Sequence, residues 1–316
     1  MENRLGTFGV ALRVLVTGGA GFLGSHVVDA LLLRGDAVVV VDDLSTGERG
    51  NLNRAAELRV ADISDREALG RALADERLDA VVHCAAKTKV VESMEKVDLY
   101  RRVIVDGTGN VLELAARTGA TRFVNISTGG AIYGETAVCA NERTRTAPAS
   151  NYGRFKAQAE RAVASAKLRA ISLRLANIYG PRQRGDLEGG VIAIFIGCWK
   201  RGEPITVFGD GRYERDYVYI ADVVEAVVAG LEGEQTGVYN VGTGIATSVN
   251  QLVAALTKLL GSPAGVVHAP PRPGEVLRGC VDPGKAARKG LWRPRTLLAP
   301  GLRATAEAEG AFASRA

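Results

Sequence analysis

The sequence predicts an α/β protein built on a doubly wound parallel sheet, with a second, smaller mixed α/β domain. Short apolar runs alternate with segments of helical periodicity through the first half of the 316-residue chain, as in proteins whose parallel strands are joined by crossover helices. A glycine-rich turn follows the first apolar run, and two aspartates follow the second. Hydrophobic residues make up 47% of the chain and charged residues 24%, so an ordinary globular core is expected.

The first strand, helix and strand form a complete structural unit. Arg13–Thr17 is a short apolar run, the turn Gly18-Gly-Ala-Gly21-Phe-Leu-Gly24 follows it, Ser25–Arg34 has helical periodicity, and Ala37–Val41 is a second buried strand. A strand, a glycine turn, a helix and a strand that ends in an acid together form the unit that binds dinucleotides. Glycines alone would only indicate a tight turn, but here every part of the unit is in register.

Each residue of the turn has a physical task in such a unit. Gly18 permits the tight turn, Gly21 lets the backbone approach a pyrophosphate, and Gly24 allows the helix to pack closely on the strand. Phe22 and Leu23 lie between these glycines, where the N–H groups of a helix N-terminus can face the anion.

The acids at the end of the second strand indicate which dinucleotide binds. Asp42 and Asp43 follow the turn at about 20 residues, the separation at which an acid reaches the adenosine ribose. Asp42 is placed to accept hydrogen bonds from the ribose hydroxyls, and its charge repels a 2′-phosphate. NAD is therefore expected rather than NADP.

Further strands and helices continue the alternation. Strands are expected at Leu58–Val60, Ala80–His83, Phe123–Ile126 and Ala170–Leu175, and helices at Arg66–Ala74, Tyr100–Thr118 and Tyr152–Lys167. Ligands of doubly wound sheets bind beyond the carboxyl ends of the strands. The residues just after these ends should therefore line one crevice with the glycine turn: Asp62, Ile63, Ala85, Ala86, Ser127, Thr128 and Asn177.

Tyr152 and Lys156 are candidates for acid–base chemistry. They lie four residues apart in a predicted helix, so their side chains share one helical face. An ammonium beside a phenol favours the phenolate and lowers a pKa that is otherwise about 10. Ordinary surface helices often carry the same spacing, so the pair indicates catalysis only together with the cofactor unit.

Composition and cysteine usage argue against several classes of function. The formal net charge of +5 is dispersed with no basic run, which disfavours nucleic acid and favours a small anionic ligand. The four cysteines and three histidines are scattered, so we expect neither a disulfide framework nor a metal site, and a reducing compartment fits. A secretory signal and a membrane-spanning apolar run are not found, so we expect a cytoplasmic protein.

A series of sequence blocks resembles a known family over almost the whole chain. These blocks are VTGGAGFLGSH, VVDDLSTG, HCAA, DGTGNVLELA, STGGAIYGE, YGRFK, LRLANIYGPRQR, VFGDGRYERDYVYIADVV, YNVGTGIATSVNQL and RPGEVLR. They are similar to the extended short-chain dehydrogenase/reductases, specifically the nucleotide-sugar epimerase/dehydratase group and, within it, the UDP-glucose (UDP-galactose) 4-epimerases. The glycine spacing G-x-x-G-x-x-G is also a variant that this family uses.

The resemblance implies an isomerase mechanism. Tyr152 would be the acid/base, and the hydroxyl of Thr128 would form a hydrogen bond with the sugar O4. Lys156 would lower the pKa of Tyr152 and hold the nicotinamide ribose. The proton of the C4 hydroxyl would go to Tyr152 and the C4 hydride to NAD⁺, giving a 4-keto sugar that rotates about its phosphate linkage before the hydride returns to the opposite face. Related dehydratases carry two carboxyl residues after this threonine, whereas this chain has Gly129 and Gly130, which argues against dehydration.

The resemblance also implies the positions that meet the substrate. Asn177, Arg215 and Arg272 match residues that contact the diphosphate, and Val191 and Phe208 match residues around the base. Gly279 matches a position that limits the room for a 2-acetamido group, so a roomy site that accepts N-acetylhexosamines is expected. We expect residues 1–176, with a return segment near 213–240, to bind NAD and residues 177–316 mainly to bind the nucleotide sugar.

Some positions depart from the family pattern and leave alternatives open. Ile104 stands where the family often has Asn, and Phe155 where Ser is frequent. Lys87 follows Ala85 and Ala86 either as a surface lysine or as a cation near the nicotinamide or sugar. Thr128 matches the catalytic hydroxyl only if a one-residue insertion is allowed, and otherwise Ser127 would serve.

Three further expectations concern assembly and function. The predicted helices at Tyr100–Thr118 and Tyr152–Lys167 could pack across a two-fold axis, and the family resemblance implies a homodimer. The protein could instead be another keto-sugar enzyme with a different base or reacting carbon. A non-catalytic NAD-binding regulator is the other alternative, although the presence of Tyr152, Lys156 and Thr128 counts against it.

Overall fold

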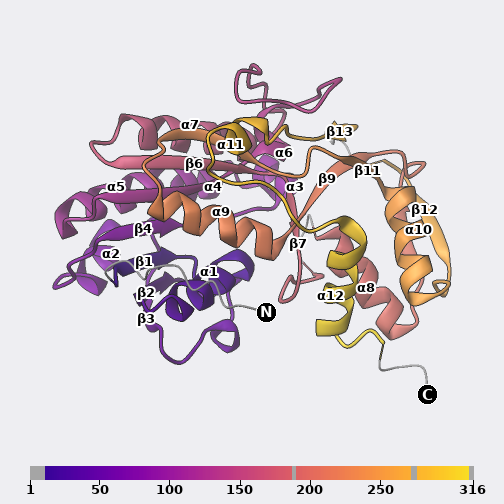
Figure 1. The fold of residues 1–316 in the computed structure, drawn as a ribbon, viewed down its shortest axis with the longest axis horizontal. Helices are drawn as coiled ribbons and strands as arrows, with labels where there is room; N and C mark the ends of the chain where they lie inside the picture. Colours follow the sequence, from indigo (N-terminus) through magenta and orange to yellow (C-terminus); the bar gives the residue numbers. More distant parts are fainter. Residues whose placement is uncertain (1–10, 187–189, 272–275, 313–316) are drawn as a thin grey trace.

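A seven-stranded parallel sheet forms the centre of the larger part of the molecule (Figure 1). The computed structural model describes residues 11–186, 190–271 and 276–312. The strands run in the spatial order β10-β6-β5-β4-β1-β2-β3, and every neighbouring pair is parallel. They are β1 (Arg13–Thr17), β2 (Ala37–Asp42), β3 (Glu57–Val60), β4 (Ala80–His83), β5 (Arg122–Thr128), β6 (Arg169–Leu175) and β10 (Gly237–Val241). The predicted doubly wound fold is thus confirmed.

Alternate residues of each strand face two separate cores. Val14 and Val16 of β1 belong to one buried cluster, and Leu15 belongs to the other. Strands buried on both faces carry few polar side chains, which explains why these strands read as continuous apolar runs. The first cluster is covered by α1 (Phe22–Leu33) and α9 (Ile220–Glu232), and the second by α2 (Arg66–Ala72), α5 (Gly107–Thr118) and α7 (Asn151–Ser165).

The predicted elements are present, with one informative difference. Every predicted strand lies within two residues of its expected ends. The helix expected at Tyr100–Thr118 consists instead of α4 (Val97–Arg101), a π-helical turn at Arg102–Asp106 and α5. Hydrophobic periodicity cannot distinguish a π turn from α-helix, because the turn inserts only a local change of pitch.

A smaller part of the molecule packs at one end of the large sheet, on the right in Figure 1. Its strands are β7 (Asn177–Tyr179), β9 (Glu214–Tyr219), β11 (Ala246–Ser248) and β13 (Arg278–Gly279) in one sheet, with β8 (Ile205–Phe208) and β12 (Val266–Ala269) in another. Its helices α8 (Val191–Arg201), α10 (Val249–Leu260) and α12 (Leu298–Ala308) share a third core. The remaining short helices are α3 (Val90–Glu95), α6 (Gly129–Ile132), α11 (Gly284–Arg288) and a 3₁₀ turn at Arg49–Asn51.

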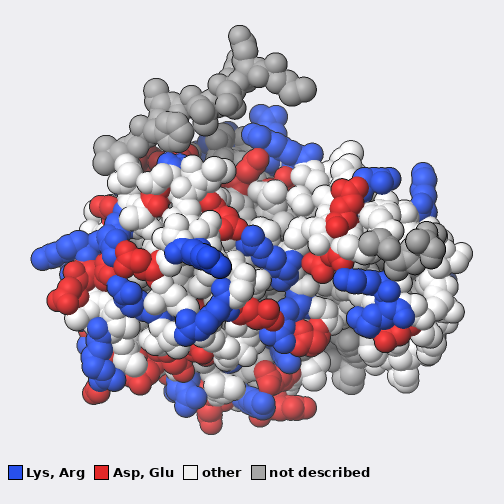
Figure 2. Space-filling view, turned by 90° about the horizontal axis from the view of Figure 1, so that it is seen from below, with Lys and Arg blue, Asp and Glu red and all other residues white. Residues whose placement is uncertain are grey.

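The surface carries charges of both signs. On the face seen in Figure 2, Lys and Arg side chains are interspersed with Asp and Glu, without the continuous basic stripe that follows a nucleic acid backbone. Within the described ranges, no helix combines the length and apolar character needed to cross a membrane.

A buried histidine joins the ends of two strands to the helix behind them. His83 ends β4, its Nδ1 lies 2.7 Å from Thr17 Oγ1 at the end of β1, and its Nε2 lies 3.0 Å from Thr108 Oγ1 in α5. The Thr108 hydroxyl donates to the Ile104 carbonyl, so it accepts from Nε2–H and the imidazole is neutral. Burial lowers the pKa of His83 to about 3, because the charged form would lose its hydration.

We predict that His83 makes the protein sensitive to acid. Between pH 3 and 6.5 the unfolded chain binds a proton at His83 that the native state excludes, so stability falls as the pH falls through this range. Substituting His83→Asn should reduce this slope by up to about 1.4 kcal/mol per pH unit. Urea unfolding at a series of pH values measures how the free energy of unfolding changes with pH. The control is His268→Asn, a substitution at an exposed position. An unchanged slope would show that His83 does not titrate on unfolding.

A disulfide corrects one expectation from the sequence. Cys139 and Cys280, which are 141 residues apart, are joined by a bond of 2.00 Å, whereas scattered cysteines predicted no disulfide. Residues next to these cysteines pair directly, because Ala140 and Val281 form a parallel bridge and Ala140 N–H donates to the Cys280 carbonyl at 3.0 Å. Sequence separation could not reveal this proximity, which depends on the tertiary fold.

We predict that this disulfide stabilises the protein by restricting the unfolded chain. Substituting Cys280→Ser should lower the free energy of unfolding by about 2–4 kcal/mol, and a dithiol reductant should do the same to the wild type. Substituting the free Cys198→Ser is the matched control. Thiol titration of the unfolded, unreduced protein should find only Cys84 and Cys198 reactive. Reaction of all the cysteines would refute the prediction.

Candidate active site

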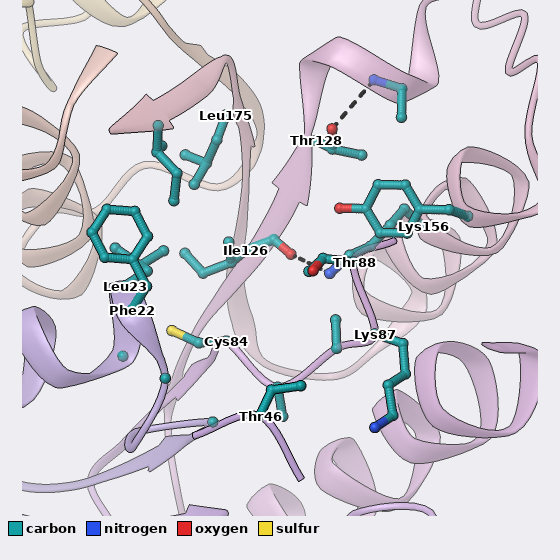
Figure 3. Close-up of a pocket in the computed structure, with 18 of the residues that line it drawn as sticks. Phe22, Leu23, Thr46, Cys84, Lys87, Thr88, Ile126, Thr128, Lys156 and Leu175 are labelled. Carbon is teal, nitrogen blue, oxygen red and sulfur yellow. Dashed lines mark hydrogen bonds between the residues drawn. The ribbon is translucent and has the colours of Figure 1, made fainter. Parts of the chain in front are cut away.

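A cavity of about 470 Å³ opens at the carboxyl ends of the strands. This is the position expected for a ligand of a doubly wound sheet, at the switch point between β1 and β4. Its lining brings together most of the residues predicted from the sequence: Gly18, Gly21, Phe22, Leu23, Gly24, Asp42, Asp43, Asp62, Ile63, Ala85, Ala86, Ser127, Thr128, Tyr152, Lys156, Asn177 and Arg215. Figure 3 displays several of these side chains around the central space.

The glycine turn leaves no room for side chains. Gly18 has φ +67°, and a Cβ there would lie 2.7 Å from the Ala85 nitrogen. A Cβ on Gly24 would lie 2.0 Å from the Gly18 carbonyl oxygen, so α1 packs directly on the turn. The N-terminus of α1 therefore faces the cavity with backbone N–H groups, and its first turn contains no acidic residue. This cradle fits a diphosphate.

Asp42 is fixed at the other side of the cradle. Its Oδ2 accepts from Ala20 N–H at 2.9 Å and its Oδ1 accepts from Leu44 N–H at 2.8 Å. Burial raises the pKa of Asp42, while these N–H donors oppose that shift. Each carboxylate oxygen keeps acceptor capacity for a ribose hydroxyl, so the residues present fit the adenosine ribose of NAD.

A hydroxyl and a phenol meet at the opposite end of the cavity. Thr128 and Tyr152 both line the cavity, and the Thr128 side chain lowers the pKa of the Tyr152 phenol. The Thr128 Oγ1 accepts from Ala131 N–H at 3.3 Å and so caps α6. Ser127 instead directs its Oγ into the protein and donates to Glu160 Oε1 at 2.5 Å. Of the two candidate hydroxyls, that of Thr128 is therefore the one that acts on the phenol.

Lys156 does not contribute to the pKa of Tyr152 in this structure. Burial raises the pKa of Tyr152 to about 12, and the Thr128 side chain opposes this shift. Lys156 Nζ donates to the Ile126 carbonyl at 2.8 Å (Figure 3), and burial lowers the pKa of Lys156 to about 8. The ammonium is thus engaged with the backbone, and burial destabilises the charged form of both groups.

A buried polar network holds the helix that carries these two residues. Glu160, one turn beyond Lys156 on α7, pairs with Arg174 of β6 at 2.6 Å and accepts from Ser127 of β5. At the start of the same helix, Tyr152 N–H donates to Ser93 Oγ at 3.1 Å. The helix is therefore attached at both ends of its functional segment.

Two departures from the family pattern pack against each other. Ile104 in the π turn and Phe155 in α7 belong to one buried cluster with Tyr100 and Ala159. Ile104 is 1% exposed, so it fills the space between the π turn and α7 with apolar atoms. The polar support expected near the cofactor is replaced here by hydrophobic contact that positions the catalytic helix.

Other predicted residues lie outside the cavity lining. Val191 begins α8 and Phe208 ends β8, both in the smaller part, and Gly279 lies in β13 beside Arg215. Arg272 falls outside the described residues. In the described ranges no group of three or more His, Cys, Asp or Glu could hold a metal ion.

Several lining residues were missed by the sequence analysis. They are Ser45 and Thr46 after β2, Thr88 after β4, and Arg182, Gln183 and Arg184 after β7; Lys87, whose role the sequence left open, also lines the cavity. The rule that ligands bind beyond strand ends applies to them as well, but it does not say how far a loop continues along the cleft.

Comparisons with known proteins agree with the site. The model of the NAD dependent epimerase/dehydratase family matches residues 14–242. The UDP-glucose 4-epimerase of Mycolicibacterium smegmatis is 37% identical over 307 residues, covering 94% of this chain and 98% of that protein. The solved UDP-glucose 4-epimerase of Thermotoga maritima with UDP-glucose superimposes with a TM-score of 0.92 at 40% identity, covering 96% and 100%.

A second solved structure has a comparable similarity. The UDP-glucose 4-epimerase of Thermus thermophilus in complex with NAD gives a TM-score of 0.90 at 40% identity, covering 94% of this chain and 98% of that one. With a family match over most of the chain and relatives that align nearly end to end, the chain belongs to the NAD-dependent epimerase/dehydratase family, as its sequence motifs predicted.

Proposed function

We propose that the protein is an NAD-dependent UDP-sugar 4-epimerase that interconverts UDP-glucose and UDP-galactose. The observation that carries this proposal is that the Tyr152 phenol and the Thr128 hydroxyl line the same cavity as the glycine cradle. A proton acceptor and a dinucleotide cradle in one cleft suit oxidation of a sugar alcohol. The names of the relatives support the substrate class, since UDP-glucose 4-epimerases align over almost the whole chain.

In this proposal the residues of the chain move one proton and orient one hydroxyl. Tyr152 accepts the proton of the sugar C4 hydroxyl and later returns it, and Thr128 holds the same hydroxyl by a hydrogen bond. Bound NAD⁺ supplies the hydride acceptor and then the hydride donor, so the cycle is redox-neutral. A nearby positive charge favours the phenolate; Lys156 lines the same cavity, with its Nζ bonded to the Ile126 carbonyl, and the bound NAD⁺ would add a further positive charge.

The distribution of carboxylates favours epimerisation over dehydration. Among the described residues that line the cavity, the carboxylates are Asp42, Asp43 and Asp62. They follow β2 and β3, whereas Thr128 ends β5 and is separated from β2 by β4 and β1. Adjacent strands are about 4.8 Å apart, so these acids lie too far from the reacting carbon to eliminate water.

The smaller part supplies the proposed contacts to the nucleotide. Asn177 at the start of β7 and Arg215 in β9 both line the cavity, and a guanidinium suits a diphosphate through its paired donors. We propose Arg272, Val191 and Phe208 as further contacts to the diphosphate and base. The division into a cofactor part and a nucleotide-sugar part is also a proposal, supported by α9 and β10, which return to the large sheet.

We also propose a homodimer and a cytoplasmic location. The apolar side chains of Val91, Met94 and Val97 are 46%, 51% and 39% exposed around α3 and α4, next to the helices expected at a two-fold axis. Sedimentation velocity of the purified protein tests the dimer, and a single species with the mass of one chain would refute it.

We predict that Tyr152→Phe lowers turnover by about 10²- to 10⁴-fold, because the phenol transfers the proton in the rate-determining oxidation. The bound NAD and the thermal midpoint should stay near wild type. Interconversion of UDP-glucose and UDP-galactose, resolved by chromatography, is the measurement. Tyr239→Phe is the matched control, because the Tyr239 ring lies against Lys285 Nζ and outside the cavity lining. Turnover of Tyr152→Phe near wild type would refute the mechanism, and net accumulation of NADH would refute a redox-neutral cycle.

We predict that the enzyme also epimerises UDP-GlcNAc. Gly279 is the smallest residue possible at its position, and a Cβ there would contact Arg215 Cδ at 3.4 Å, so a larger side chain would reduce the room where the family resemblance places the 2-acetamido group. Substituting Gly279→Tyr should reduce kcat/KM for UDP-GlcNAc at least tenfold more than for UDP-glucose, a difference typical of steric exclusion. Equal losses on both substrates, or no wild-type activity on UDP-GlcNAc, would refute the assignment.

A further inference from the structure

Lys87 connects the ends of two strands that lie on either side of the strand leading into the glycine turn. Lys87 follows β4 and its Nζ donates to Ser45 Oγ at 2.9 Å, while Ser45 follows β2. In the sheet, β1 lies between β4 and β2. The Lys87–Ser45 bond therefore crosses the end of β1, which is where the glycine turn begins, and both residues line the same cavity as that turn.

We propose that Lys87 retains the bound NAD by closing the cleft over the adenosine diphosphate half of the cofactor. The inference rests on the proposed function, since it assumes that NAD occupies the glycine cradle. It assigns Lys87 to cofactor retention, a different role from both alternatives that the sequence left open. The side chain is directed away from Lys156 (Figure 3), so we assign it no part in proton transfer or sugar binding.

A second cation fixes the same loop from the other side. Arg184, in the segment after β7, donates from Nη1 to the Thr46 carbonyl at 3.3 Å and lies 3.4 Å from Glu48. Residues Ser45 to Glu48 are thus held from two separate segments of the chain. Leu44, at the start of this loop, has φ +58°, a conformation that costs free energy in a non-glycine residue and is found mainly where function requires it.

The positive charge of the Lys87 ammonium suits a nearby diphosphate. Asp43 Oδ1 accepts from Ser45 Oγ at 2.7 Å, so the ammonium, the hydroxyl and a carboxylate form a chain across the entrance. The Lys87 ammonium also opposes the effect of burial, which raises the pKa of Asp42. A dinucleotide adds two negative phosphate charges beneath this entrance, and a cation above them strengthens retention.

A redox-neutral cycle requires that the cofactor remain bound between its two steps. The same cofactor molecule must stay bound through the oxidation and the reduction of one sugar, because loss between these steps leaves an enzyme without a hydride to return. A bond that crosses the entrance must break before the cofactor leaves. The release rate should therefore depend on Lys87 even though Lys87 is remote from the reacting carbon.

The test measures NAD release, separately from turnover. Purified protein is loaded with radiolabelled NAD, diluted into excess unlabelled NAD, and filtered at intervals. We expect Lys87→Met to raise the release rate constant about tenfold, the effect of losing one charge-assisted hydrogen bond, and Lys87→Arg to restore much of the retention. Lys89→Met is the matched control, because Lys89 is two residues away and outside the cavity lining; it should match the wild type.

A double-mutant cycle tests the closure itself. Substituting Ser45→Ala should raise the release rate several-fold alone but add little to Lys87→Met, since either change breaks the same bond. Fully additive effects would overturn closure, because they would mean that Lys87 acts without Ser45. A Lys87→Met protein that unfolds normally and releases NAD at the wild-type rate would overturn the inference alone. A wild-type protein that binds no NAD would overturn the proposed function and this inference together.

Discussion

The buried ion pair between Glu160 and Arg174 is the interaction on which the geometry of the site depends. It joins α7 to β6, and Ser127 extends it to β5 through a 2.5 Å hydrogen bond. Tyr152 and Lys156 share α7 with Glu160, and Thr128 directly follows Ser127, so one network fixes the phenol, the ammonium and the hydroxyl relative to one another. Removing one partner of a buried pair typically costs about 3–5 kcal/mol, which makes this helix hard to displace.

The same network continues toward the smaller part of the molecule. The Arg174 guanidinium lies 4.9 Å from the centre of the Tyr133 ring, and the Tyr133 hydroxyl donates to Asn240 at 2.7 Å. Asn240 in turn donates to the Ala140 carbonyl at 2.8 Å, next to the Cys139–Cys280 disulfide. Polar contacts therefore run from α7 to the segment that carries Gly279, which couples the position of that segment to that of the helix bearing Tyr152 and Lys156.

The sequence predicts the sheet and the cofactor cradle well because both depend on local patterns. Apolar runs, glycines and acids at fixed separations are sufficient to locate β1, α1 and Asp42. What it could not predict depends on contacts between distant segments: the disulfide, the choice between Ser127 and Thr128, and the bond from Lys87 to Ser45. Nothing in the sequence relates Ile104 to Phe155, and only the folded structure shows that these two departures from the family pattern share one buried cluster.

Burial acts on the acid–base pair in a way that makes the cofactor part of the catalytic switch. It raises the pKa of Tyr152 to about 12 and lowers that of Lys156 to about 8, so burial favours the uncharged form of each group. A phenolate forms near neutral pH only if further positive charge enters the cleft. An oxidised nicotinamide would supply such a charge, and a reduced one would not. Tyr152 would then be a phenolate, able to accept a proton, when the sugar hydroxyl must lose one, and a neutral phenol, able to donate it, when the sugar must regain one, which is the order that epimerisation requires.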